Sequence, residues 1–164
     1  MPIRRVLFLD IDGVLHRGGS YRTRDGVASS APGRIELFEF AGILDELLTP
    51  YSNIEIVFSS DWAFTFGVDY TRDRLPLQSL RDRVVGATYQ GCEFDERLWP
   101  MLSRGTQVID YARRHSLRRW IAVDDRQDGF DGHWHRLVHC QSECGLGDPV
   151  VVELLRDRLQ REFS

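Results

Sequence analysis

The sequence lacks three features that would direct it to particular classes of protein. Only three of its 164 residues are cysteine, an odd number that excludes a disulfide framework and favours a reducing, cytoplasmic location. No apolar run approaches the ~20 residues of a membrane-spanning helix, and the one near the start is too short for a signal peptide, so no membrane association is expected. Positive charge is not in excess: 21 basic against 25 acidic residues give −4, hence no global attraction to nucleic acid.

What the sequence does have is typical of one ordinary globular domain spanning residues 1–164. Hydrophobic residues make up 42% and charged residues 28%, which is enough apolar material for a core without disulfides. Arginines gather locally within 72–83 and 113–119. Such clusters could bind phosphates, but solvated helix faces are the favoured interpretation.

The most informative stretch lies close to the start. A short apolar run, Val6 to Leu9, predicts a buried strand that ends in Asp10 and Asp12, followed by Gly13. Two carboxylates at the end of a buried strand are costly unless a cation meets them, and a divalent cation with oxygen ligands is the usual partner. Glycine allows a sharp turn and brings backbone N–H groups close to a bound anion.

The apolar periodicity predicts an α/β fold with about five parallel strands between helix layers. Strands are expected at 3–9, 53–58, 84–89, 120–123 and 136–139, and helices at 35–48, 104–115 and 150–163, with a helix-like stretch at 64–70 and a short helix at 77–81. Segment 16–33 is polar and turn-rich, so it is expected to form a loop or a small flap over the acids. Segment 90–103 is expected to be irregular, and no insert is long enough for a large cap domain.

Three of the expected strands end in polar side chains, which should converge because ligands of open parallel sheets bind at the carboxyl ends of the strands. The groups are Asp10/Asp12, Ser59/Ser60 and Asp124/Asp125, with Arg104 beginning the helix that leads into the fourth strand. Four acids, two hydroxyls and a fixed cation suit a Mg²⁺-assisted reaction at a phosphoryl group.

Chemistry assigns candidate roles within this group. A carboxylate beside Mg²⁺ can attack phosphorus and form an aspartyl-phosphate, and a second carboxylate can protonate the leaving oxygen and later activate water. Hydroxyls and backbone N–H groups after the second strand can hold the transferring oxygens, Arg104 can balance charge, and the acids after the fourth strand can hold the metal. The candidate substrate-binding residues are Gly13, Ser59, Ser60, Asp61 and Trp62.

The order of these groups resembles the four motifs of the haloacid dehalogenase (HAD) superfamily, from residue 6 to about 125. Phe-Leu-Asp10-Ile-Asp12-Gly-Val-Leu resembles the first motif, Ser59 the second, Arg104 the third and Asp124-Asp125 the fourth. The resemblance implies a three-layer Rossmann-like core. It further implies that Asp10 is nucleophile and metal ligand, that Asp12 is general acid/base and ligates metal through its backbone carbonyl, and that Asp124 ligates the metal beside Asp125.

Finer details resemble a small HAD subgroup found alone or in RNA-repair proteins. They are Phe-Ser-Ser-Asp-Trp62 after the second strand, Arg104-Gly105 before the helix, Val-Asp-Asp after the fourth strand and Gly145-Leu146-Gly147 late in the chain. One departure is that the third motif offers arginine where lysine is commoner, and arginine is a rigid fork of donors rather than a compact ammonium. Arg97 and Arg113 are therefore alternative candidates for this cation.

Three further choices remain open at this point. Ser59 is preferred over Ser60 as the second-motif residue, although either could simply cap a helix. His133, His135, His139, Cys140 and Cys144 could bind zinc, but their spacing fits no structural zinc pattern, so packing is favoured. Aromatic residues Trp62, Phe64 and Phe66 could stack on a base, and core packing is again favoured, with Trp62 the exception beside the expected site.

The expected function is that of a Mg²⁺-dependent phosphomonoesterase acting through an aspartyl-phosphate. A poorly capped site favours a phosphate on a large molecule, such as a nucleic-acid end, over an enclosed small metabolite. A partner protein or a second copy of the chain could instead supply a lid. The sequence leaves the oligomeric state open. The alternative is a catalytically silent HAD-like module that binds phosphorylated or nucleic-acid partners. Cleavage of a carbon–halogen bond is disfavoured because it would leave Asp12 and the Asp124-Asp125 pair without a purpose.

Overall fold

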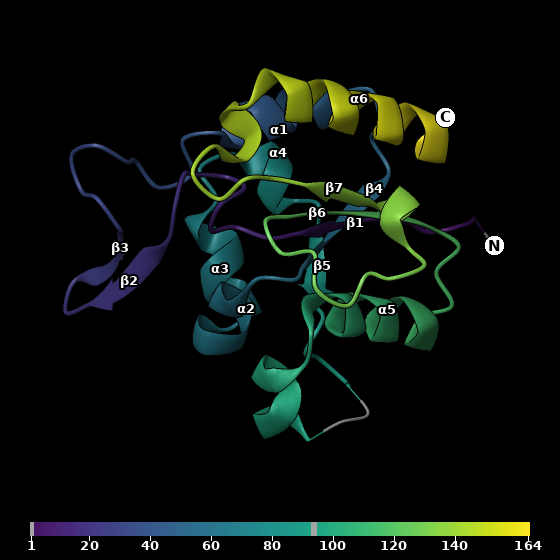
Figure 1. The fold of residues 1–164 in the computed structure, drawn as a ribbon, viewed down its shortest axis with the longest axis horizontal. Helices are drawn as coiled ribbons and strands as arrows, with labels where there is room; N and C mark the ends of the chain where they lie inside the picture. Colours follow the sequence, from purple (N-terminus) through teal and green to yellow (C-terminus); the bar gives the residue numbers. More distant parts are fainter. Residues whose placement is uncertain (1, 93–94) are drawn as a thin grey trace.

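The fold is a five-stranded parallel sheet flanked by helices, as a computed structural model describing residues 2–92 and 95–164 shows (Figure 1). The strands are β1 (Arg5–Leu9), β4 (Ile54–Phe58), β5 (Val84–Ala87), β6 (Arg119–Asp124) and β7 (Leu137–His139), in the order β5-β4-β1-β6-β7. The chain winds from β1 toward one edge and then returns to the other side of β1. The carboxyl end of β1 is therefore the point where the strand order reverses, and ligands of such sheets bind there.

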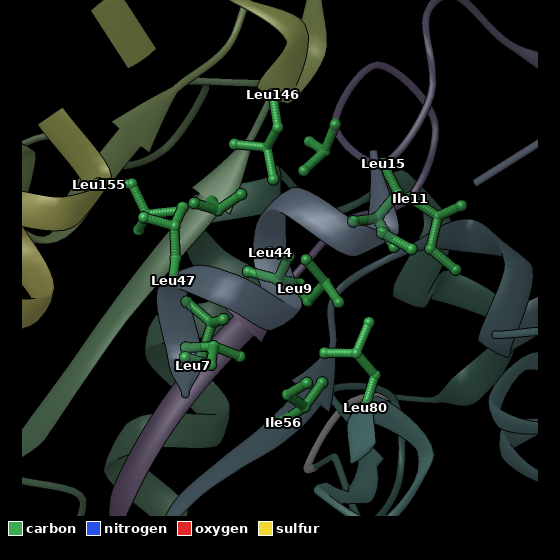
Figure 2. Close-up of a cluster of buried hydrophobic side chains, with 14 of the residues drawn as sticks. Leu7, Leu9, Ile11, Leu15, Leu44, Leu47, Ile56, Leu80, Leu146 and Leu155 are labelled. Carbon is green, nitrogen blue, oxygen red and sulfur yellow. The ribbon is translucent and has the colours of Figure 1, made fainter. Parts of the chain in front are cut away.

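The two faces of the sheet bury alternate residues of each strand, as a strand period of two requires. Leu7 and Leu9 lie in one buried cluster with side chains of α1 (Ala41–Leu48) and α6 (Pro149–Phe163), among them Leu44, Leu47 and Leu155 (Figure 2). Val6 and Phe8 pack instead with α5 (Arg104–Arg114) on the opposite face. Helices on both faces explain why the strands are continuous apolar runs. These three layers confirm the predicted α/β, Rossmann-like core.

The predicted helix at 35–48 was too long at its start, because α1 begins only at Ala41. Turns precede it, and Phe38 adopts a left-handed φ of 61° that no helix allows. The backbone N–H of Phe38 donates to the Nδ1 atom of His16, and the N–H of Phe40 donates to the carbonyl of Leu15. These contacts with the loop after β1 hold residues 35–40 in turns, although their apolar periodicity is typical of a helix.

The polar segment 16–33 is more ordered than a loop. It contains an antiparallel hairpin, β2 (Ser20–Thr23) and β3 (Gly26–Ser29), which projects from one end of the sheet (Figure 1). The helix-like stretch after β4 divides at Gly67, with φ 89°, into α2 (Asp61–Phe66) and α3 (Val68–Arg74), and α4 (Gln78–Arg81) follows.

Three of the connections contain short 3₁₀ turns. The segment expected to be irregular, 90–103, contains a 3₁₀ turn at Glu96–Met101, and its residues 93 and 94 lie outside the described part of the chain. Two more 3₁₀ turns lie at Trp134–Arg136 and Gly145–Gly147. Across residues 2–92 and 95–164, none of the helices has both the length and the apolar character needed to cross a bilayer.

Candidate active site

Three carboxylates meet at the carboxyl edge of the sheet. Asp10 follows β1, Asp124 ends β6 and Asp125 comes next, and one oxygen of each lies within 4.8 Å of the others. Asp10 and Asp124 are buried, with exposed fractions of 3% and 0%. Parallel pairing of β1 with β6 sets this proximity, because Leu9 lies opposite Val123 and the backbone N–H of Asp10 donates to the carbonyl of Val123.

Burial makes the ionised form of this trio costly. Desolvation, followed by the charge of Asp124, raises the pKa of Asp10 well above its ordinary value. Desolvation likewise raises the pKa of Asp124 to about 6 and that of Asp125 to about 7, where Asp10 adds further repulsion. A cation among these oxygens would remove that cost.

Arg104 is the cation nearest to the trio. Its side chain is buried in the first turn of α5, with Nε 3.6 Å from Oδ2 of Asp124 and Nη2 3.8 Å from Oδ1 of Asp61. Desolvation opposes the charge of Arg104, but Asp10, Asp124 and Asp61 outweigh it and raise the pKa. The Nε and Nη1 atoms have no hydrogen-bond partner. A buried guanidinium with unused donors beside three acids is suited to receive the oxygens of an anion such as a phosphoryl group.

The two alternative cations are not at this site. The side chain of Arg97 is 89% exposed and pairs with Asp95. Arg113 is exposed in the last turn of α5, whereas Arg104 lies in the first. Of these three arginines, the geometry therefore brings only Arg104 to the acids.

The residues after β4 divide into different environments. The hydroxyl of Ser59, fully buried, donates to Oδ2 of Asp124 at 3.3 Å. The hydroxyl of Ser60 accepts the backbone N–H of Trp62 and so caps α2. The side chain of Asp61 is 65% exposed. Of the two serines, Ser59 has its hydroxyl at the acidic trio.

The carboxylate of Asp12 lies outside the trio and is held by other donors. His16 Nε2 lies 2.8 Å from its Oδ1, and Ser20 Oγ donates to the same oxygen at 2.9 Å. The indole Nε1 of Trp62 lies 3.2 and 3.3 Å from Oδ1 and Oδ2. Sequence reasoning missed His16 and Ser20, since a polar loop offers no periodicity that marks which of its residues turn inward.

Gly13 allows the chain to pass close to Asp125, and its backbone N–H is not available to an anion at the site. Its N–H donates to the carbonyl of Gly18, within the loop, instead of pointing to an open anion site. Its φ is 75°, and a Cβ there would lie 2.3 Å from Oδ2 of Asp125. Only glycine lets the chain turn this close to that carboxylate.

Replacing Gly13 therefore tests how tightly the trio is held. Gly13→Ala is expected to displace Asp125, weaken Mg²⁺ binding by about 10-fold or more and destabilise the fold by roughly 1–3 kcal/mol. Calorimetric titration with MgCl₂ and urea unfolding measure the two effects. The matched control is Gly42→Ala on α1, where a Cβ meets nothing within 4 Å. Equal Mg²⁺ affinity in Gly13→Ala and the wild type would contradict this account of the turn.

The histidine and cysteine cluster does not form a metal site. Within the part of the chain that the structure describes, the acidic trio is the group of three or more side chains placed to share an ion. His139 contacts the carbonyl of Asp125 through Nε2, and Cys140 is buried in the core. Phe64 stacks on Trp99, so it packs as favoured. Trp62, the expected exception, is 3% exposed and places its indole nitrogen beside Asp12.

The donor set of the trio fits Mg²⁺. All three side chains offer carboxylate oxygens, the hard ligands that this ion prefers. A structural zinc site would instead need sulfur or imidazole ligands.

The raised pKa values predict how the metal-free protein responds to pH. In the folded protein the pKa of Asp124 is about 6 and that of Asp125 about 7, against 3.8 for an ordinary aspartate. Between these pH values the unfolded chain therefore binds fewer protons than the folded protein does. In chelator, stability should therefore fall by roughly 2–4 kcal/mol as pH rises from about 4 to about 7, and MgCl₂ should restore it at pH ~7.5.

Urea unfolding across this pH range, with EDTA or with MgCl₂, measures the effect. Asp125→Asn should flatten the fall, because it removes one of the titrating groups. A wild-type protein whose stability rises from pH ~5 to ~7 in EDTA, with the same profile in Asp125→Asn, would contradict the electrostatics of the trio.

The comparison with protein families agrees with this geometry. The comparisons with curated proteins and with solved structures returned no significant match. A scan against protein families matched residues 6–151, most of the chain and all of the residues of the site, to the family described as the HAD domain in Swiss Army Knife RNA repair proteins. With its parallel sheet and its acids after β1 and β6, the chain belongs to this family of HAD domains.

Proposed function

We propose that this protein is a Mg²⁺-dependent phosphomonoesterase that acts through an aspartyl-phosphate on Asp10. The observation that carries the proposal is the buried guanidinium of Arg104, whose unused donors lie beside Asp10, Asp124 and Asp125. Burying a cation and three acids together is costly for folding, so this group is better explained as a binding site for a charged ligand than as a stabilising feature.

The residues have distinct roles in this proposal. Asp10, Asp124 and Asp125, together with the backbone carbonyl of Asp12, hold Mg²⁺, which supplies positive charge for the nucleophile and the phosphoryl oxygens when bound. A carboxylate oxygen of Asp10 attacks phosphorus as the bond from phosphorus to the leaving oxygen breaks, and Asp12 gives that oxygen a proton.

The second half of the reaction returns the site to its first state. Asp12 takes a proton from water, the water oxygen attacks phosphorus, and the bond from phosphorus to Asp10 breaks to release inorganic phosphate. Arg104 balances the charge on the phosphoryl oxygens, while the hydroxyl of Ser59, which donates to Oδ2 of Asp124 in the structure, turns to one of them when substrate binds. At the start of α2, the exposed Asp61 borders the substrate, while Ser60 and Trp62 are buried in the same turn.

The substrate class proposed is the terminal phosphate of a nucleic acid or a nucleotide. Among the described residues, the insert beside the site is the hairpin of β2 and β3 rather than a cap domain, and the side chain of Asp12 is 36% exposed. An uncovered site admits a phosphate carried by a large molecule. The RNA repair proteins named in the family description fit this class.

A substrate panel tests the proposal. Phosphate release should be measured from 5′- and 3′-phosphorylated RNA and DNA, nucleotides, sugar phosphates and an aryl phosphate, with MgCl₂ and with EDTA. We expect turnover of the aryl phosphate and of at least one polynucleotide end, abolished by EDTA. Tight binding of a phosphorylated end without release from any substrate would instead establish a silent binding module.

A further inference from the structure

Three side chains gather at the carboxylate of Asp12, and we infer that they act as positioning residues for proton transfer. The group of His16, Ser20 and Trp62 is here called the Asp12 clamp. His16 and Ser20 donate to Oδ1 of Asp12, and Trp62 orients Ser20, which leaves Oδ2 to give and take the proton. The inference rests on the proposed function and adds to it which atom of the general acid/base works and what keeps it in place.

His16 is a fixed donor of this clamp. Its ring is fully buried, and its Nδ1 accepts the backbone N–H of Phe38 at 3.2 Å. A ring nitrogen that accepts a hydrogen bond carries no proton, so the proton is on Nε2, which donates to Oδ1 of Asp12 at 2.8 Å. Phe38 presents its N–H from a left-handed φ of 61°, a conformation that costs about 1 kcal/mol or more in a residue with a side chain. The fold therefore accepts strain where the tautomer of His16 is set.

Ser20 and Trp62 form the second arm. The indole N–H of Trp62 has a single hydrogen, and its nearest acceptor is the hydroxyl of Ser20 at 2.9 Å. That hydroxyl in turn donates to Oδ1 of Asp12 at 2.9 Å. The contacts from the indole nitrogen to Oδ1 and Oδ2 are longer, at 3.2 and 3.3 Å. Trp62 therefore orients Ser20, and Ser20 supplies the hydrogen bond.

The two oxygens of Asp12 consequently differ. Oδ1 accepts from His16 and Ser20 with good geometry, which uses the lone pairs that a proton would otherwise occupy. Oδ2 has, within the described residues, only the long contact from Trp62. A carboxyl group fixed through one oxygen rotates less, so its other oxygen stays aimed for proton transfer.

Packing alone does not require this arrangement. The three residues come from the loop after β1, the hairpin strand β2 and the first turn of α2, and each presents a polar atom to the same carboxylate. Phe38 contacts both aromatic rings edge-on, with centroids 5.8 Å from His16 and 5.4 Å from Trp62. An apolar residue at 16 could pack against those rings, but it would offer neither an acceptor to the N–H of Phe38 nor a donor to Asp12.

The test is the dependence of kcat/KM on the leaving group across a series of aryl phosphates. Loss of general-acid help affects phenyl phosphate, whose leaving oxygen needs a proton, far more than 4-nitrophenyl phosphate. We expect Trp62→Phe and Ser20→Ala to lower kcat/KM for phenyl phosphate about 10-fold more than for 4-nitrophenyl phosphate, which steepens the leaving-group slope. Ser20→Ala lies on the hairpin outside the core, so it tests the clamp even where a core variant fails to fold.

Matched variants separate positioning from packing. Trp99→Phe removes an equally buried indole N–H that has no hydrogen-bond partner, so the slope should stay at the wild-type value. His16→Gln keeps an N–H where Nε2 stood and should retain a slope close to wild type, whereas His16→Leu should steepen it. Equal losses on both substrates, or the same slope in Trp62→Phe and Trp99→Phe, would overturn the clamp. A wild type that hydrolyses no phosphate ester would overturn the proposed function itself, and the clamp with it.

Discussion

Asp10→Asn is expected to abolish hydrolysis of an aryl phosphate, with a loss of at least about 10³-fold, because an amide cannot form the aspartyl-phosphate. The fold should survive the same change. Burial and the neighbouring charge of Asp124 raise the pKa of Asp10, so a neutral isostere relieves repulsion in the metal-free protein. We expect urea unfolding in EDTA to show equal or greater stability than the wild type. A lost activity in a well-folded variant separates chemistry from structure.

The matched control for this variant is Asp157→Asn on α6, an aspartate that pairs with Arg161 at the surface. It should leave both hydrolysis and stability near wild type, since exposed ion pairs contribute little. If Asp10→Asn retains more than about a tenth of wild-type turnover, Asp10 is not the nucleophile.

Arg104→Met is expected to impair stability and catalysis together. The side chain is 3% exposed, and its charge offsets those of Asp10 and Asp124, so removing it leaves buried acids uncompensated. The expected cost is about 3 kcal/mol of unfolding free energy at pH ~7.5. Hydrolysis should fall by about 10²–10³-fold, the usual effect of losing one group that stabilises transition-state charge. Urea unfolding and aryl phosphate turnover measure the two effects.

Two further variants sharpen this result. Arg113→Met, exposed in the last turn of the same helix, should change stability by no more than about 0.5 kcal/mol and leave turnover intact. Arg104→Lys keeps the charge but loses the planar fork, so we expect partial recovery of activity. Wild-type turnover in Arg104→Met would contradict the charge-balancing role.

Much of the fold could be predicted because it depends on short-range apolar periodicity. Runs such as Ile-Glu-Ile-Val-Phe read directly as buried strands, and their alternation with helices implied a parallel sheet. The start of α1 could not be predicted in this way. Its position depends on Phe38 meeting His16, a contact across 22 residues, and tertiary contacts override local periodicity.

The candidate site was predictable to the extent that strand ends converge. Asp10, Asp124 and Asp125 follow buried strands, so parallel pairing alone brings them together. Arg104 had rivals in the sequence, where all 21 basic residues are arginines, and only the packing of α5 selects it. The partners of Asp12 were not predictable, because a hairpin and a turn bring them in from irregular segments. Sequence patterns therefore located the acidic trio with Ser59 and Arg104, but not the side chains that hold Asp12.

The most direct test of the central claim is chemical capture of the phosphorylated nucleophile. The wild-type protein with MgCl₂ and an aryl phosphate should be quenched in acid during turnover, reduced with borohydride, which converts an acyl phosphate to an alcohol, and analysed by peptide mass spectrometry. The account predicts reduction of the side chain at position 10, dependent on MgCl₂ and substrate and absent in Asp10→Asn. Phosphate release during turnover with reduction at another residue, or with none, would contradict it.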